Sequence, residues 1–384
     1  MRVRVPLPAQ DCVTYKKLHV TYYTFKMRKI IFCITSLFVG LLLFVIAMQQ
    51  AGVGDVLRTI SLFPLSIIIL VLLVNFIAIC VIGSWRWKII IESQNSHKIS
   101  FLKIFRAKLV GFTVSYITPS VLVGGEPVRA YMIKEDGICN WEKSFASVVI
   151  DQAIYFFSLF LLMITGFLFL VYHFSLPIEV FLGFGIIIIF TVLTFYLFYS
   201  KILNGNSGED GFFMFIIKTL KLNRIKFVRS KEKNIKRTEK IIAQFFKTKK
   251  EVFLKAFLLA VLEGILYLIV ICSIILCFDS ANVFEFTQSF SIFFLITLAN
   301  FIPIPGSFGS FEAALTFIFD LLNLGKSNGF TFSLIYRFIN IALVVVGFFA
   351  LIHFEITTAS HKFGAEAPKA LLKMHKFLKR IIHN

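Results

Sequence analysis

Two segments of this otherwise apolar chain place charged side chains beside helix breakers. The first reads PSVLVGGEPVRAY and holds Glu126 and Arg129. The amino end of a helix favours an anion, and Arg129, one turn inside, adds a forked donor set that fits phosphate. The competing interpretation is structural: Glu126 caps the helix and Arg129 extends to the membrane interface. The residues expected to shape this turn are Gly124, Gly125 and Pro127, two for the sharp bend and one for the first helical position.

The second segment, PIPGSFGSFEAA, begins at residue 303. Ser307 or Ser310 is expected to cap the helix that follows. Glu312 then lies in the first turn, where the helix dipole favours a carboxylate. Capping is a full structural explanation for Glu312, and substrate binding is the alternative. The helix breakers of this segment are Pro303, Pro305, Gly306 and Gly309.

Three further ionisable residues, Asp151, Glu263 and Arg337, lie within long apolar runs. A charge at bilayer depth is costly and usually marks a pathway or an internal ion pair. Arg337 shares a helical face with Asn340, and it either pairs with Glu312 or binds a phosphate. These residues, with Glu126, Arg129 and Glu312, form the predicted substrate-binding set.

The composition shows what must position these residues. The chain has 384 residues, of which 58% are hydrophobic and only 16% charged, against about 25% charged in an average soluble protein. A polar shell around a soluble core is therefore excluded. We expect an all-α polytopic membrane bundle with six full spans. The expected spans are 30–48, 62–84, 144–171, 178–200, 252–277 and 330–353.

The formal net charge of +19 follows from positive-inside loops, so no nucleic-acid partner is predicted. Basic residues follow the second expected span, among them Arg86 and Lys108, and we expect them in the cytoplasm. Residues 201–250 carry fourteen Lys or Arg and four acids. This loop lies in the cytoplasm only if 104–138 enters the membrane from the cytoplasm and returns to the same side. A re-entrant hairpin is therefore predicted at 104–138. Residues 286–324 form either a second re-entrant hairpin or two short spans.

The order of elements predicts an inverted repeat, with one half at 30–171 and the other at 178–353. Each half contains two spans, a broken hairpin and a further span, and inverted repeats with broken helices are typical of transporters. The transmembrane domain covers 30–355, after a cytoplasmic extension at 1–29. The loop 201–250 and the tail 356–384 are predicted to form basic amphipathic helices on an anionic inner leaflet.

No catalytic motif, cofactor-binding motif or metal-ligand spacing is recognisable. The six cysteines form no CxxC pair, so neither disulfides nor a metal site are predicted. Transport is thus favoured over chemistry. A membrane enzyme with Glu126 as general base remains as an alternative that rests on one carboxylate.

Three stretches together resemble the lysylphosphatidylglycerol synthase transmembrane-region family, also described as the flippase-like domain. They are GGEPVRAYMIK, PIPGSFGSFEAAL and YRFIN, and the resemblance covers about 30–355. It implies a helical inner-membrane protein, some of whose relatives move aminoacylated phospholipid between leaflets. Two-part relatives also carry a soluble catalytic domain, for which this chain has no room, so lysyl transfer is not expected.

The leading hypothesis is therefore a translocase for a phospholipid or a lipid-linked headgroup. It predicts an inner-membrane protein with both termini in the cytoplasm, and a site where the two hairpins meet. The alternative is an accessory subunit for an envelope glycosyl- or acyltransferase, in which the basic loop 201–250 is the essential part.

Overall fold

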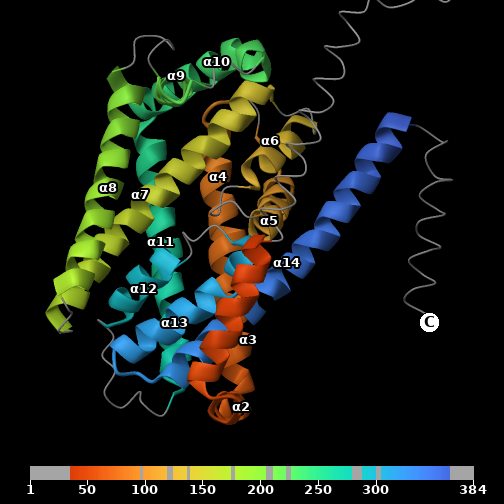
Figure 1. The fold of residues 1–384 in the computed structure, drawn as a ribbon. Helices are drawn as coiled ribbons and strands as arrows, with labels where there is room; N and C mark the ends of the chain where they lie inside the picture. The colour runs from red at the N-terminus through yellow and green to blue at the C-terminus, as the bar shows by residue number, and fades with distance from the viewer. Residues whose placement is uncertain are drawn as a thin grey trace, which may run out of the picture.

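The computed structural model describes residues 35–95, 98–118, 124–135, 139–173, 178–204, 211–221, 226–278, 288–299 and 304–363. All regular structure in these ranges is helical (Figure 1). The predicted extension 1–29, residues 364–384 of the predicted tail, and Pro303 lie outside them. The all-α prediction is confirmed.

The helices follow one another with short breaks. After a helix at Thr35–Ala51 come α2 (Val53–Leu62), α3 (Leu65–Phe76), the π-helical stretch η1 (Ile77–Ile82), α4 (Gly83–Glu92), α5 (Phe101–Ile117), α6 (Glu126–Glu135), α7 (Trp141–His173), α8 (Ile178–Asn204), α9 (Phe212–Thr219), α10 (Lys226–Thr248), α11 (Lys250–Ile275), α12 (Gln288–Ala299), the 3-10 turn η4 (Pro305–Ser307), α13 (Ser310–Leu321) and α14 (Lys326–Phe363).

Five helices in the described residues are long and apolar enough to cross a membrane. A sixth span results if Thr35–Ala51 and α2, which meet at 80°, are counted together. Lipid offers no hydrogen-bond partners, so helices that satisfy their own backbone are the expected spanning elements. The polytopic bundle is thus confirmed. The five long segments are Leu65–Glu92, Trp141–His173, Phe181–Ile202, Lys250–Ile275 and Lys326–Glu355.

The predicted first hairpin consists of α5 and α6. The two helices pack antiparallel through a buried apolar cluster that includes Ala107, Ala130 and Ile133. The chain at Gly125 approaches α5 closely: a Cβ placed on Gly125 would lie 1.9 Å from the carbonyl oxygen of Gly111. The Gly125 N–H donates to Ser115 Oγ at 2.8 Å. Neither helix is among the five long spans, as expected for a hairpin that does not cross.

The second hairpin consists of α12 and α13, joined through η4. Gly306 and Gly309 have φ values of 58° and 78°, in the left-handed region that glycine adopts without strain. Gly309 occupies the N-cap of α13, so the expectation that Ser307 or Ser310 caps this helix is wrong. The hairpin packs on the core shared by α7, α11 and α14.

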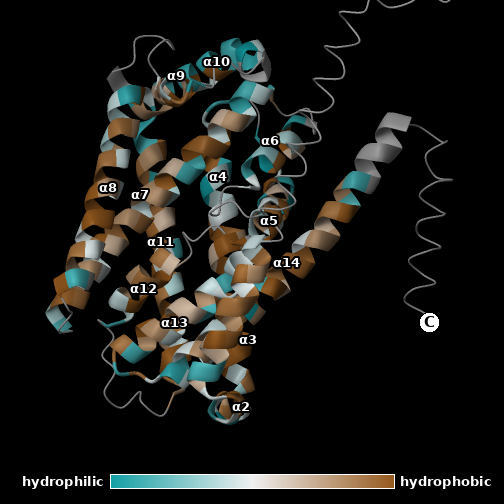
Figure 2. Cartoon of the chain, in the orientation of Figure 1, coloured by the Kyte–Doolittle hydropathy of each residue, from teal (hydrophilic) through white to brown (hydrophobic). Residues whose placement is uncertain are grey.

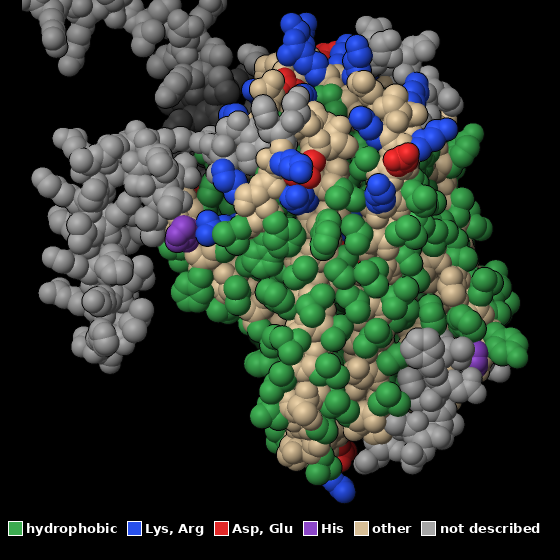
Figure 3. Space-filling model, turned by 180° about the vertical axis from the view of Figure 1, so that it is seen from behind, with side chains coloured by type: hydrophobic (Ala, Val, Ile, Leu, Met, Phe, Trp, Pro, Cys, Tyr) green, Lys and Arg blue, Asp and Glu red, His purple; other side chains and the backbone are tan. Residues whose placement is uncertain are grey.

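Charge is distributed unevenly along the bundle. Hydrophilic residues gather around α10 and α6 at one end, and the long helices are mostly hydrophobic (Figure 2). Lys and Arg side chains cluster at the same end above a broad apolar surface (Figure 3). Helix α10 lies across this end, and its apolar residues Ile242 and Phe245 are buried against the bundle. The apolar face of the predicted amphipathic loop is thus largely covered by protein.

The close approach at Gly125 predicts a steric penalty. Gly125→Ala should destabilise the protein by about 1–3 kcal/mol, because the added methyl group meets the backbone of Gly111. The matched control is Gly183→Ala on α8, where a Cβ meets nothing within 4 Å. Thermal unfolding in detergent measures both. Equal melting temperatures for the two variants would contradict the tight hairpin.

Candidate functional site

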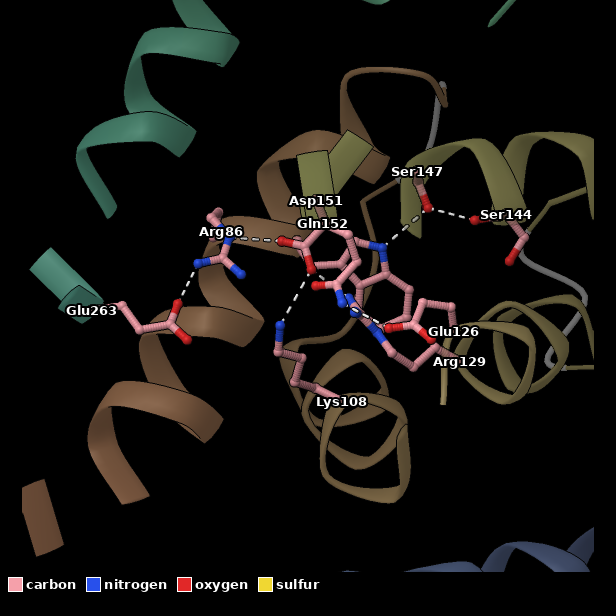
Figure 4. A network of polar contacts seen from close by, with 10 residues as sticks. Arg86, Lys108, Glu126, Arg129, Ser144, Ser147, Asp151, Gln152 and Glu263 are labelled. Carbon is pink, nitrogen blue, oxygen red and sulfur yellow. Dashed lines mark hydrogen bonds and ion pairs between the residues drawn. The ribbon is translucent and has the colours of Figure 1, made fainter. Parts of the chain in front are cut away.

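Asp151 on α7 is the centre of a buried cluster of charges (Figure 4). Its Oδ1 accepts a hydrogen bond from Arg86 Nε at 2.7 Å. Its Oδ2 accepts one from Arg129 Nη2 at 2.6 Å and one from Lys108 Nζ at 3.2 Å. Asp151 is fully buried. One carboxylate therefore joins cations from three other helices, α4, α5 and α6.

Arg86 connects this centre to α11. Its Nη1 donates to Glu263 Oε2, and its guanidinium lies 4.9 Å from the centre of the Tyr155 ring. Nη2 of the same side chain is buried without a hydrogen-bond partner among the described residues. The π-helical stretch η1 directly precedes α4, and π-helical insertions occur frequently at functional sites. It adds an extra residue to the turn that leads to Arg86.

Arg129 is held by an aromatic face as well as by Asp151. Its guanidinium lies 4.2 Å from the centre of the Trp87 ring. The Trp87 Nε1–H donates to Ser147 Oγ at 3.1 Å, which fixes the plane of the indole. Arg129 Nε is buried without a hydrogen-bond partner among the described residues. An unused buried donor on a guanidinium is unusual, because such groups are normally satisfied.

Glu126 lies beside the cluster but is turned toward Gln152. Gln152 Nε2 donates to Glu126 Oε1 at 2.7 Å, while Glu126 Oε2 is buried without a partner. No described cation forms an ion pair with Glu126. Three cations contact two carboxylates directly in this cluster, and Glu126 is a third buried carboxylate beside them.

Two glycines make room for this packing. A Cβ on Gly83 would lie 2.9 Å from Lys108 Cε, and one on Gly111 would lie 2.4 Å from Arg129 Cγ. The Lys108 side chain therefore passes the α4 backbone at Gly83, and the Arg129 side chain passes the α5 backbone at Gly111. Larger residues at these positions would displace the cations from Asp151.

Arg337 and Glu312 form a second, separate pair. Arg337 Nε donates to Glu312 Oε1, and its terminal nitrogens donate to the carbonyl oxygens of Gly306 at 3.0 Å and Ser307 at 3.2 Å. Glu312 Oε2 accepts from the Gly309 N–H at 2.7 Å. All three nitrogens of Arg337 are thus used to brace the second hairpin. Of the two roles expected for Arg337, the structure contains the pairing with Glu312.

The two hairpins come close together where Tyr116 of α5 lies beside Gly306 of η4. A Cβ placed on Gly306 would lie 3.4 Å from Tyr116 Cε1, at the end of α5. The six predicted binding residues therefore fall into two groups. One holds Asp151, Glu263 and Arg129, with Glu126 beside it. The other holds Glu312 and Arg337, beside hairpin residues Gly306 and Gly309.

Two residues of the first group were missed by sequence reasoning. Arg86 and Lys108 were counted only as part of a basic stretch expected on the cytoplasmic side, whereas both are buried in the bundle, a role that was not predicted for them. The need to balance buried charges could have pointed to these two residues. Two carboxylates in apolar spans require cations nearby, because an unpaired buried charge is strongly unfavourable.

The segment that contains these residues matches a known protein family. The family model described as "Lysylphosphatidylglycerol synthase TM region" matches residues 33–347. The chain belongs to this family. The match includes both hairpins and every residue of the Asp151 cluster. No solved structure matches the chain significantly.

Two similar proteins carry the name UPF0104 membrane protein. The UPF0104 membrane protein of Methanothermobacter thermautotrophicus is 23% identical over 313 residues, 80% of this chain and 89% of that protein. The UPF0104 membrane protein of Methanocaldococcus jannaschii is 33% identical over 147 residues, 36% of this chain and 43% of that protein. These likenesses support a multi-pass membrane protein, and neither name states an activity.

The site chemistry suits an anion better than a metal. Within the described ranges, no three His, Cys, Asp or Glu residues gather as metal ligands would. The carboxylates of the cluster are already engaged by arginine and lysine, while the unused groups include two guanidinium donors. Guanidinium donors match the oxygens of phosphate.

Asp151→Asn should destabilise the protein by about 3–5 kcal/mol, because three buried cations lose their shared counter-charge. The control is Asp320→Asn, which removes an exposed ion pair with Lys326 and should change stability by about 1 kcal/mol or less. Thermal unfolding in detergent measures both. Adding Lys108→Met to Asp151→Asn should restore part of the loss. Equal effects of the Asp151 and Asp320 variants would show that the cluster is not a central stabilising element.

Proposed function

We propose that the protein translocates a phospholipid or a lipid-linked phosphate, and that its phosphate binds in the Asp151 cluster. The observation that carries the proposal is the pair of unused guanidinium donors, Arg86 Nη2 and Arg129 Nε, in a fully buried setting. Phosphate oxygens would satisfy both donors. The resemblance to a family described as flippase-like supports the same substrate class.

The geometry also suggests how the site exchanges partners. Asp151 Oδ2 is shared by Lys108 and Arg129, which belong to the α5–α6 hairpin. A phosphate that competes with Asp151 for these two cations would loosen the hairpin from α7 without leaving a charge unpaired. The headgroup then moves past the hairpin while the lipid tails remain in the bilayer. In this scheme, the Glu312–Arg337 pair keeps the second hairpin fixed.

Sidedness follows from charge. The basic end formed by α9, α10 and the neighbouring helix ends is assigned to the cytoplasm by the positive-inside rule. This assignment supports an inner-membrane protein with cytoplasmic termini. The inverted repeat of the two halves remains a prediction, motivated by the matching order of α5–α6 and α12–α13.

Removal of single cluster cations tests the proposal. In proteoliposomes with fluorescent phospholipid or polyprenyl phosphate, Arg129→Lys and Lys108→Gln should each slow translocation about tenfold or more, since hydrogen bonds to charged groups contribute about 1.5–3 kcal/mol. Arg129→Lys retains the charge and loses the fork, so it separates geometry from charge. The readout is the initial rate at which lipid becomes accessible to a membrane-impermeant quencher.

The matched control is Arg106→Gln, an exposed cation on the same hairpin, which should keep the wild-type rate. Each variant is first checked for a monodisperse elution profile. Wild-type rates in folded Arg129→Lys and Lys108→Gln proteins would contradict the phosphate site. No transport of any phosphate-bearing lipid by the wild-type protein would contradict the function itself.

A further inference from the structure

Helix α9 is a short apolar helix at the basic end of the protein. Only part of its apolar surface is covered by the bundle: Met214 is buried, but Phe215 and Leu220 are 37% and 63% exposed. Ile216 and Ile217 are half-buried. Exposing several large apolar side chains to water is unfavourable, and such a patch usually marks a surface that binds a membrane or a partner.

The position of α9 is fixed by a buried carboxylate. Glu239 of α10 accepts hydrogen bonds from the backbone N–H groups of Phe213 at 2.5 Å and Met214 at 3.2 Å. Gly211 leaves space for that carboxylate, since a Cβ there would lie 2.3 Å from Glu239 Cδ. Burial raises the pKa of the Glu239 carboxyl. Glu239 Oε1 therefore holds the first turn of α9, while Oε2 is buried without a hydrogen-bond partner among the described residues.

One lysine contacts the exposed apolar residues, and a second follows them in the sequence. Lys201, in the last turn of α8, places its Nζ 4.9 Å from the centre of the Phe215 ring. Lys221, directly after α9, is exposed. An apolar surface rimmed by lysines matches the boundary between the acyl chains and headgroups of an anionic leaflet.

We propose that the corner between α8 and α9 binds an anionic phospholipid. Its phosphate lies between Lys201 and Lys221, and its acyl chain lies along Phe215 and Leu220. The site is distinct from the Asp151 cluster and does not depend on the transport function. It also moves the expected leaflet contact from α10, whose apolar face packs on the bundle, to α9.

A photoreactive residue tests which molecule covers this corner. p-Benzoylphenylalanine replaces Phe215 in the full chain, which is reconstituted in equal amounts of phosphatidylglycerol and phosphatidylcholine. The control position is Leu193, 50% exposed in the middle of α8, where acyl chains of both lipids are expected. We expect enriched capture of phosphatidylglycerol at position 215 and equal capture at position 193. Equal capture at both positions would overturn the proposal.

A charge-matched pair of variants separates this site from the general basic surface. Lys201→Gln with Lys221→Gln should reduce the enrichment at position 215 by about fivefold for each lysine, corresponding to about 1 kcal/mol per cation near an anionic surface. Lys233→Gln with Lys240→Gln removes the same charge from α10 and should leave the enrichment unchanged. Equal losses in both pairs would overturn a local site. In native membranes, a crosslink from position 215 to protein rather than lipid would also overturn it.

Discussion

The structure depends on one buried carboxylate shared by three cations. Asp151 lies on α7, and it holds α4, α5 and α6 against this helix through Arg86, Lys108 and Arg129. In a low-dielectric interior these charges stabilise the fold only while they remain paired. The α5–α6 hairpin therefore cannot move away from α7 unless another anion replaces Asp151. This constraint links the packing of the hairpin to the proposed handling of phosphate.

The two hairpins differ in how firmly they are fixed. The second is braced by Arg337, each of whose three side-chain nitrogens donates to Glu312 or to a backbone carbonyl. The first is held through side chains that retain unused polar atoms, on Arg86, Arg129 and Glu126. A ligand is expected to enter where a firmly held hairpin lies beside one whose buried polar atoms lack hydrogen-bond partners. The contact between Tyr116 and Gly306 places the two hairpins next to each other at that point.

Hydropathy and the positive-inside rule predicted most of the fold. Both depend on many residues at once, so a single misjudged position changes the prediction little. The spans and the α5–α6 hairpin follow from them. The site was predicted only in part. Asp151, Glu263 and Arg129 were recognised as unusual in apolar surroundings, but Arg86 and Lys108 lie near the ends of apolar runs, where basic residues are common. Lys108 packs against the backbone at Gly83, a contact between separate helices that no periodicity in the sequence indicates.

Binding of the phosphate group itself tests the central claim most directly. Thermal unfolding of the detergent-purified protein is measured with increasing amounts of short-chain phosphatidylglycerol, and with the matching short-chain diacylglycerol, which lacks the phosphate. A ligand that binds only the folded state stabilises it by an amount that grows with the ratio of free ligand concentration to Kd. We predict a rise in melting temperature with the phospholipid that Arg129→Lys weakens, and little rise with diacylglycerol. Equal shifts for both lipids, unchanged by Arg129→Lys, would contradict the account.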